Sequence, residues 1–197
     1  MKDGFNDAGS GLCEAEQVLN SWGIKFENRP DGTLFVPGSI DISKKSLTQL
    51  PDLSRVVVNG GFNCNHNGLT SLKGSPQTVG SFYCSGNHLT SLEYGPQTVA
   101  ESFYCPYNNL ATLKGAPARC LEFWCHKNPA LESLEHAPET GKCLQSDFGT
   151  FRTLADAPDH IKKSAETRRF ELEQNVVNAT ILQASTKIRA PLKLVLR

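Results

Sequence analysis

Four cysteines of this chain recur in the same short sequence context. The four stretches read FNCNHNGLTSL, FYCSGNHLTSL, FYCPYNNLATL and FWCHKNPALESL. Their cysteines, Cys64, Cys84, Cys105 and Cys125, are 20, 21 and 20 residues apart. A period of this length is typical of a solenoid, in which one short unit stacks on its neighbours. Such a chain forms an extended surface more readily than a catalytic pocket.

Each position of the repeated unit has a physical interpretation. The most complete copy contains Val79, Phe82, Cys84, Asn87, Leu89 and Leu92, which gives V-x-x-F-x-C-x-x-N-x-L-x-x-L. Phe-x-Cys alternates with period two, so both side chains are predicted to point into the core from a short parallel strand. The asparagine is expected to hydrogen-bond the turn that leaves this strand. Prolines four residues after the last leucine predict extended return segments: Pro76, Pro96, Pro117, Pro138 and Pro158.

Two weaker copies flank the four clear ones. The upstream copy has Lys45 in the place of the asparagine, and the downstream copy has Gly149 there. Atypical terminal copies are expected, because a terminal repeat has a neighbour on one side only. The sequence therefore predicts six units over residues 38–158. Their parallel strands are expected near Ile42, Cys64, Cys84, Cys105, Cys125 and Ser146.

The unit resembles the leucine-rich repeat pattern L-x-x-L-x-L-x-x-N-x-L. Its proline-bearing return resembles the repeats of secreted bacterial leucine-rich-repeat effectors. The sequence pattern N-x-L-T-S-L-x-x-x-P-x-x-V-x-x-x-F-x-C is similar to uncharacterised repeats of phage and prophage proteins. The stretch I-K-F-E-N-R-P-D-G-T-L-F-V, which precedes the repeats, is similar to the same proteins. This resemblance implies a short leucine-rich-repeat stack that binds a protein partner.

The rest of the chain is predicted to cap the stack. Residues 1–37 are expected to form a helix with Ser10 as its N-cap, followed by a hairpin around Arg29–Gly32. Residues 159–197 are expected to form a helical cap of one or two helices, followed by an apolar tail at Leu192–Leu196, which is an alternative binding segment. The predicted fold is thus an α/β repeat solenoid with helical caps at both ends.

Charge and hydropathy bear on partners and location. The chain has 20 Lys and Arg against 20 Asp and Glu, so its formal net charge is zero. Nucleic-acid binding is disfavoured, because it normally needs a basic surface. The first residues lack an apolar leader and no stretch is long enough to span a membrane, so a location in the cytoplasm of a bacterial host is expected.

The four repeat cysteines are predicted to be buried and reduced, and the sequence determines Cys13, Cys120 and Cys143 less closely. None forms a C-x-x-C pair, and four share one repeat position. In-register strands place Cβ atoms about 4.8 Å apart, whereas disulfides need about 3.5–4.5 Å. A ladder of ligands also diverges along its axis and cannot converge on one metal ion. We expect thiols packed as small apolar residues, and neither a metal nor another cofactor.

A column of side chains is predicted to face outward from the strands, between the aromatic residue and the cysteine of each unit. It consists of Asp41, Asn63, Tyr83, Tyr104, Trp124 and Gln145. An aromatic stripe with polar neighbours is typical of a protein-binding hot spot. The alternative is that Tyr and Trp are simply good strand residues that stack on each other. The candidate binding residues on this expected concave face are Tyr83, Tyr104, Trp124, Tyr107, His126, Asn63 and Gln145.

Enzymatic activity is not predicted. The five histidines are dispersed over different units, and His126 points to the opposite face from its neighbour Cys125. The chain contains no glycine-rich phosphate loop, H-E-x-x-H or G-x-S-x-G motif. Three functions stay open. The first is a phage or prophage factor that inhibits a host protein, such as a defence or CRISPR protein. The second is an effector that binds a eukaryotic signalling protein, and the third is a single-stranded nucleic-acid binder that uses stacked aromatics.

Overall fold

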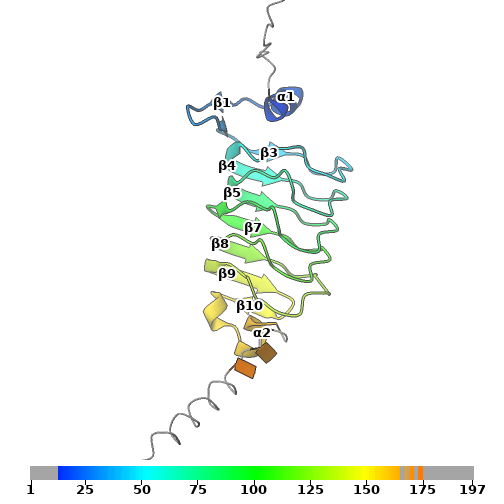
Figure 1. Cartoon of the computed structure of the whole chain (residues 1–197), viewed down its shortest axis with the longest axis vertical. Helices are drawn as coiled ribbons and strands as arrows, with labels where there is room; N and C mark the ends of the chain where they lie inside the picture. Colours follow the sequence, from blue (N-terminus) through cyan, green and yellow to red (C-terminus); the bar gives the residue numbers. More distant parts are fainter. Residues whose placement is uncertain (1–12, 165–166, 168, 171–172, 175–197) are drawn as a thin grey trace, which may run out of the picture. The chain divides into compact units, whose positions relative to one another are not determined.

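The computed structural model describes residues 13–164, 167, 169, 170, 173 and 174. The chain divides into two compact units, Met1–Lys162 and Lys163–Arg197. The first unit is a β-solenoid of about five turns with parallel strands (Figure 1). In the second unit, the described residues from 167 onward are helical, and Arg169 Nε donates a hydrogen bond to Glu173 Oε1 at 3.0 Å.

One sheet runs the length of the stack, in the strand order β1-β2-β4-β5-β7-β8-β9-β10. The strands of the turns pair in parallel and are β3 (Ile40–Asp41), β4 (Val56–Asn63), β5 (Thr78–Tyr83), β6 (Thr98–Val99), β7 (Ser102–Tyr104), β8 (Arg119–Trp124) and β9 (Glu139–Ser146). The predicted parallel stack is therefore confirmed. β4, β5, β7 and β8 end one residue before the repeat cysteines, near which their strands were expected. The main-chain hydrogen bonds between turns still reach these cysteines, since the N–H of Cys64 donates to the carbonyl of Tyr83 at 2.8 Å.

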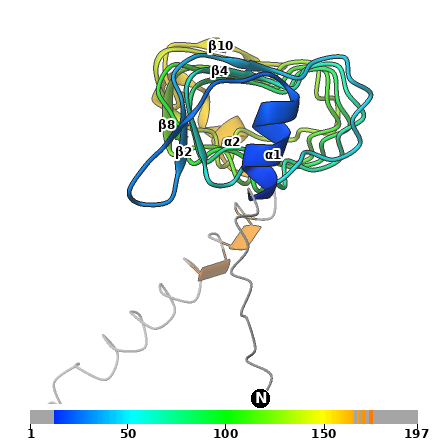
Figure 2. The ribbon, with the colours of Figure 1, turned by 90° about the horizontal axis from the view of Figure 1, so that it is seen from above.

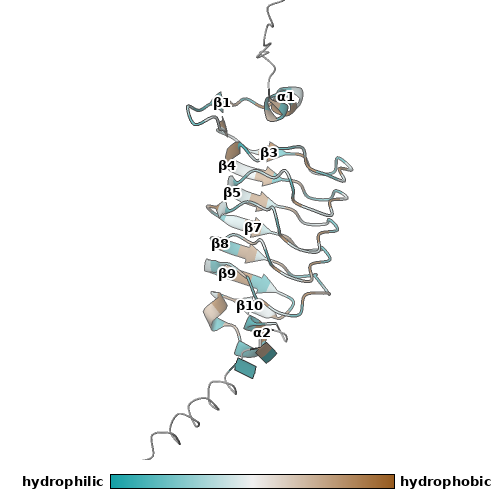
Figure 3. Ribbon diagram, in the orientation of Figure 1, coloured by the Kyte–Doolittle hydropathy of each residue, from teal (hydrophilic) through white to brown (hydrophobic). Residues whose placement is uncertain are grey.

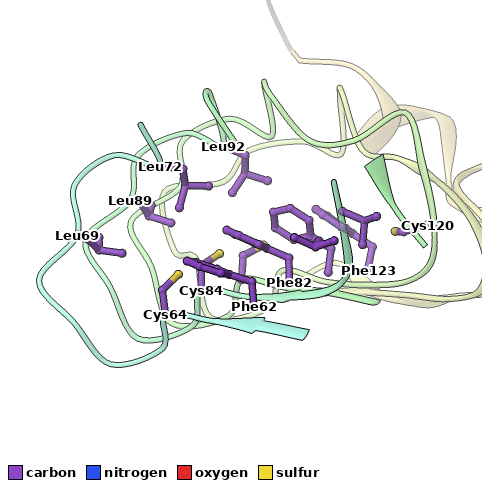
Figure 4. Packing of buried hydrophobic residues seen from close by; sticks show 14 of the residues in the cluster. Phe62, Cys64, Leu69, Leu72, Phe82, Cys84, Leu89, Leu92, Cys120 and Phe123 are labelled. Atoms are coloured by element: carbon purple, nitrogen blue, oxygen red, sulfur yellow. The ribbon is translucent and has the colours of Figure 1, made fainter. Parts of the chain in front are cut away.

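Phenylalanines fill the centre of the stack. Phe62, Phe82, Phe103 and Phe123 are fully buried partners in register, with ring centroids 5.2–5.6 Å apart. Figure 4 shows the rings lined up along the stack, with the thiols of Cys64 and Cys84 beside them. Leu72 and Leu92 close this core from the return side (Figure 4). Hydrophobic segments accordingly recur on successive strands of the stack (Figure 3).

The repeat asparagines tie each turn to the one before it. Asn87 Nδ2 donates to the carbonyl of Cys84 in its own turn and to that of Cys64 in the preceding turn, at 3.0 and 3.1 Å. Its Oδ1 accepts the N–H of Leu69 at 3.1 Å. The predicted turn-capping role is confirmed, and it extends between turns. The same pattern recurs at Asn67, Asn108 and Asn128.

The return segments are extended or turn-like, as the prolines predict. No helix occurs in residues 42–153. Viewed down the stack, the coils superpose as a flattened ring (Figure 2). Four of the five repeat prolines are buried in it, and only Pro158, beyond the last turn, is exposed.

At the N-terminal end, α1 (Glu14–Ser21) lies across the open coil (Figure 2) and buries Ala15 and Leu19 against the core. The expectation of an N-cap at Ser10 is wrong. Cys13 is the N-cap, and its N–H donates to the carboxylate of Glu16 at 2.8 Å, while Ser10 lies outside the described residues. The predicted hairpin is confirmed as β1 (Glu27–Asn28) paired antiparallel with β2 (Leu34–Val36), and β2 continues in parallel beside β4.

At the other end of this unit, the sixth predicted repeat does not complete a turn. The chain reverses after β9, and β10 (Gly149–Phe151) pairs with it antiparallel. The 3-10 helix η1 (Leu154–Asp156) and the four-residue helix α2 (Asp159–Lys162) follow, with Ile161 buried. Most of the helix predicted up to residue 187, and the tail at Leu192–Leu196, lie outside the described residues. No helix in the described part of the chain is long and apolar enough to cross a membrane.

Candidate partner-binding site

Three aromatic side chains stack on the outward face of the sheet, and we refer to Tyr83, Tyr104 and Trp124 as the aromatic column. The register pairs them as neighbours on β5, β7 and β8. The ring centroids of Tyr83 and Tyr104 are 5.1 Å apart with an interplanar angle of 11°, and those of Tyr104 and Trp124 are 5.4 Å apart at 34°. All three side chains are half-buried. The column thus offers ring edges to a partner while its members support one another.

A carboxylate fixes the middle of the aromatic column. The Tyr104 hydroxyl donates a hydrogen bond to Glu122 Oε2 at 3.0 Å. Partial burial and this hydrogen bond to Glu122 raise the pKa of Tyr104, so its phenol stays protonated and neutral near pH 7. The ring is therefore held by stacking on two sides and by its hydroxyl, which limits the freedom it would lose on binding.

Tyr107 and His126 extend the aromatic column at its side. The His126 ring meets both the Tyr107 and the Trp124 rings edge to face, with centroids 6.0 Å apart in each case. Tyr107 is 60% exposed, and its backbone φ is +55°. The same position has positive φ in the other turns as well, where it is occupied by His66, Gly86 and Lys127. Tyr107 therefore places an exposed aromatic ring at a position that is left-handed throughout the stack.

Asn63 and Gln145 continue the line of the aromatic column at its two ends. Asn63 is the register partner of Tyr83, and Gln145 is that of Trp124. The Oδ1 of Asn63 accepts the N–H of Asn65 at 3.1 Å, so this side chain folds back on its own turn. The seven residues named from the sequence thus lie on one face, five of them in ring-to-ring contact.

Two buried polar atoms beside the aromatic column have no hydrogen-bond partner in the described part of the chain. They are Nε1 of Trp124 and Nδ1 of His126. An unpaired buried donor or acceptor costs about 1–3 kcal/mol, so a polar group of a partner or a water molecule that reached these atoms would be stabilising.

Two glutamates beside the aromatic column were not named from the sequence. Glu122 accepts hydrogen bonds from Tyr104 and Ser102, and Glu101 accepts one from Ser81 Oγ at 3.1 Å. Each lies at a corner, which is the short segment between the first core residue of a turn and its buried phenylalanine. This corner has three residues between Val99 and Phe103 but two in the neighbouring turns. The in-and-out alternation of strand side chains therefore cannot be counted across it, and the sequence does not give the direction of these glutamates.

The four repeat cysteines form a buried apolar ladder. All seven cysteines are free, and the four repeat cysteines are fully buried. Burial raises the pKa of Cys64, Cys84, Cys105 and Cys125 well above the usual value for a thiol. Because a thiolate is the reactive and metal-binding form, such thiols are poor nucleophiles and ligands. Within the described residues, no three His, Cys, Asp or Glu side chains converge to hold a metal ion.

Comparisons with protein-family models, with curated proteins and with solved structures find no match to this chain.

Proposed function

We propose that this chain is a non-catalytic module that binds a protein partner through the aromatic column. The observation that carries this proposal is the stack of three half-exposed rings, at 5.1 and 5.4 Å, outside a core that phenylalanines already fill. Rigid aromatic area with polar neighbours is typical of interface hot spots. The exposed ring of Tyr107, in edge-to-face contact with His126, supports the same function.

The repeat sequence supports a more specific identity. The V-x-x-F-x-C-x-x-N-x-L unit resembles a leucine-rich repeat, so we propose that the solenoid is a short stack of this kind. The resemblance to phage and prophage repeats extends the proposal to the partner, a protein of the bacterial host that the module inhibits in the host cytoplasm. A defence or CRISPR protein fits this role. The alternative partner, a eukaryotic signalling protein, follows from the resemblance to secreted effectors.

Protein binding is favoured over single-stranded nucleic acid. Single-stranded nucleic acid binds by stacking its bases on the faces of aromatic rings. The centroids in the aromatic column are only 5.1 and 5.4 Å apart, so the rings already fill the space between them. Glu101 and Glu122 lie beside the column and would repel phosphates.

The test is capture from a bacterial lysate by the immobilised full chain and by matched variants. We expect a protein that the wild type captures and that Tyr104→Ala and Trp124→Ala lose, while Thr90→Ala retains it. Thr90 is an exposed residue on the return side, and circular dichroism checks that all variants are folded. With the purified partner, Trp124→Ala should weaken binding by about 2 kcal/mol or more.

Normal capture by both aromatic variants would reject the site. A chain that lacks residues 191–197 separates the aromatic column from the apolar tail. Loss of capture by this folded truncation alone would place the site in the tail.

A further inference from the structure

A cavity opens at the N-terminal end of the aromatic column, and we refer to it as the Tyr83 cavity. Its volume is about 650 Å³, and residues of β3, β4 and β5 form most of its lining. Three glycines lie on its wall, together with one aromatic ring and two carboxylates: Gly60, Gly61, Gly80, Tyr83, Asp41 and Glu101.

Tight packing of the backbone explains why this wall has no side chains. A Cβ at Gly80 would lie 2.5 Å from the carbonyl oxygen of Asn59, and one at Gly60 would lie 2.9 Å from that of Gly38. A Cβ at Gly61 would lie 3.1 Å from Cε2 of Tyr83. Backbone contacts therefore require glycine at Gly60 and Gly80, and a side chain at Gly61 would press on the Tyr83 ring.

One side of the Tyr83 ring is available to the cavity. Tyr104 stacks on one face of this ring, so its other face and its edge border the cavity. The two polar side chains that precede Tyr83 in the outward column also line the cavity, and each is held by a hydrogen bond within its own turn. Asn63 Oδ1 accepts the N–H of Asn65, and Asp41 Oδ1 accepts the N–H of Ser43 at 2.9 Å.

The charge of the Tyr83 cavity is negative. Asp41 and Glu101 line it, and none of its lining residues is basic. The N–H and hydroxyl of Ser43 hold the pKa of Asp41 below its usual value, so this carboxylate is ionised at neutral pH. Glu101 Oε2 accepts a hydrogen bond from Ser81, which orients the second carboxylate.

An aromatic face with two carboxylates matches an arginine side chain. A guanidinium is planar and stacks on aromatic rings, and its N–H groups pair with carboxylates in a fixed fork. This chain contains the same contact elsewhere, since Cζ of Arg29 lies 4.1 Å from the centroid of the Phe35 ring. Lysine has the charge but not the plane, and a neutral ring or sugar would leave the two carboxylates without a counterion.

We propose that the Tyr83 cavity binds the guanidinium of an arginine from the protein partner, stacked on Tyr83 and paired with Glu101 or Asp41. This inference rests on the proposed function, because the arginine would belong to the protein seated on the aromatic column. It can be tested without that protein, with a small probe.

The experiment is a titration of the ¹⁵N-labelled full chain with N-acetyl-arginine amide at neutral pH. The control ligand is N-acetyl-citrulline amide, which has the same shape without the charge. We expect saturable shifts of the Gly60, Gly61 and Gly80 amide signals with the arginine probe only. Tyr83→Leu and Glu101→Gln should each weaken binding of the arginine probe by about threefold to tenfold. Glu132→Gln, at an exposed residue far from the cavity in sequence, should not.

Each contrary result overturns the arginine site. Equal binding of the citrulline probe would mean that charge is not recognised. Shifts caused by a simple methyl glycoside and not by arginine would make the cavity a sugar site. Absence of glycine shifts up to millimolar probe would show that the cavity does not hold a guanidinium. These results would reject the arginine site and leave partner capture by the aromatic column intact. The opposite outcome is arginine binding together with normal capture by Tyr104→Ala and Trp124→Ala, which would reject only the proposed function.

Discussion

The side-chain oxygen of Asn87 accepts a hydrogen bond from the main-chain N–H of Leu69 at 3.1 Å, although the two residues belong to different turns. The amide nitrogen of Asn87 also donates to the carbonyls of Cys64 and Cys84. One buried side chain therefore satisfies main-chain groups of two turns that would otherwise have no access to water.

Replacing Asn87 with alanine should lower the free energy of unfolding by about 1–3 kcal/mol, because buried groups on both turns lose their partner. The matched control is Asn109→Ala. Asn109 carries an exposed side chain, and its loss should change stability by less than about 0.5 kcal/mol. Urea unfolding measures both. Equal stability of the two variants would contradict this role.

The buried thiols should make the fold sensitive to alkali. In the folded chain, burial raises the pKa of the four repeat cysteines well above the usual value of 9.0. Burial also raises the pKa of Cys120, to about 12. In the unfolded chain these thiols ionise near the usual value. The thiol contribution is fully present below pH 9 and decreases as pH rises, because only the unfolded state releases these protons. Each buried thiol should lower the free energy of unfolding by about 1.4 kcal/mol per pH unit in this range.

The measurement is urea unfolding between about pH 8.5 and about pH 10.5, where the unfolded thiols titrate. Cys84→Val should reduce the pH slope by one thiol. Val79→Ala, which only shortens a core side chain, should lower stability at every pH and leave the slope unchanged. An unchanged slope for Cys84→Val would mean that this thiol is not buried.

Cys84 should tolerate an apolar replacement better than a polar one. Its side chain is fully buried among apolar residues, so a serine hydroxyl would need a hydrogen-bond partner there. We expect Cys84→Ser to unfold at a lower temperature than Cys84→Val. Reductant and chelator should leave the melting temperature of the wild type unchanged. The reverse order of the two variants, or a loss of stability with EDTA, would argue against a packing role.

Two replacements of Tyr107 should differ in stability but weaken binding alike. At φ +55°, glycine is favoured over alanine by about 1 kcal/mol, so Tyr107→Gly should be more stable than Tyr107→Ala. Both variants remove a ring that is 60% exposed, and both should weaken capture of the partner. Thermal unfolding and capture assays measure the two effects. Alanine at least as stable as glycine would contradict the positive φ, and unchanged capture would remove Tyr107 from the site.

The regular part of the fold could be predicted from the sequence, because the 20- and 21-residue period sets both register and facing. The same alternation that buries Phe82 and Cys84 turns Tyr83 outward, so the aromatic column could be predicted as well. The ends of the stack could not be predicted in the same way. The carboxylate of Asp147 accepts the N–H groups of Lys127 and Asn128, whereas earlier turns use a main-chain carbonyl for the first of these, and the chain then reverses into β10. The Tyr83 cavity arises from missing side chains at an irregular corner, which a repeat pattern does not describe.

The asparagine bonds link each turn to its neighbour in the same way, which makes the stack divisible into interchangeable modules. Joining Cys64 directly to Ser85 would remove 20 residues, one whole period, and would bring Asn87 to the main-chain groups of Ile42 and Leu47 that Asn67 now contacts. The shortened chain would keep its hydrogen-bonded spine but would carry two stacked rings instead of three. Nature or a protein engineer can therefore change the length of the recognition surface by whole-module excision or duplication, without redesigning the core.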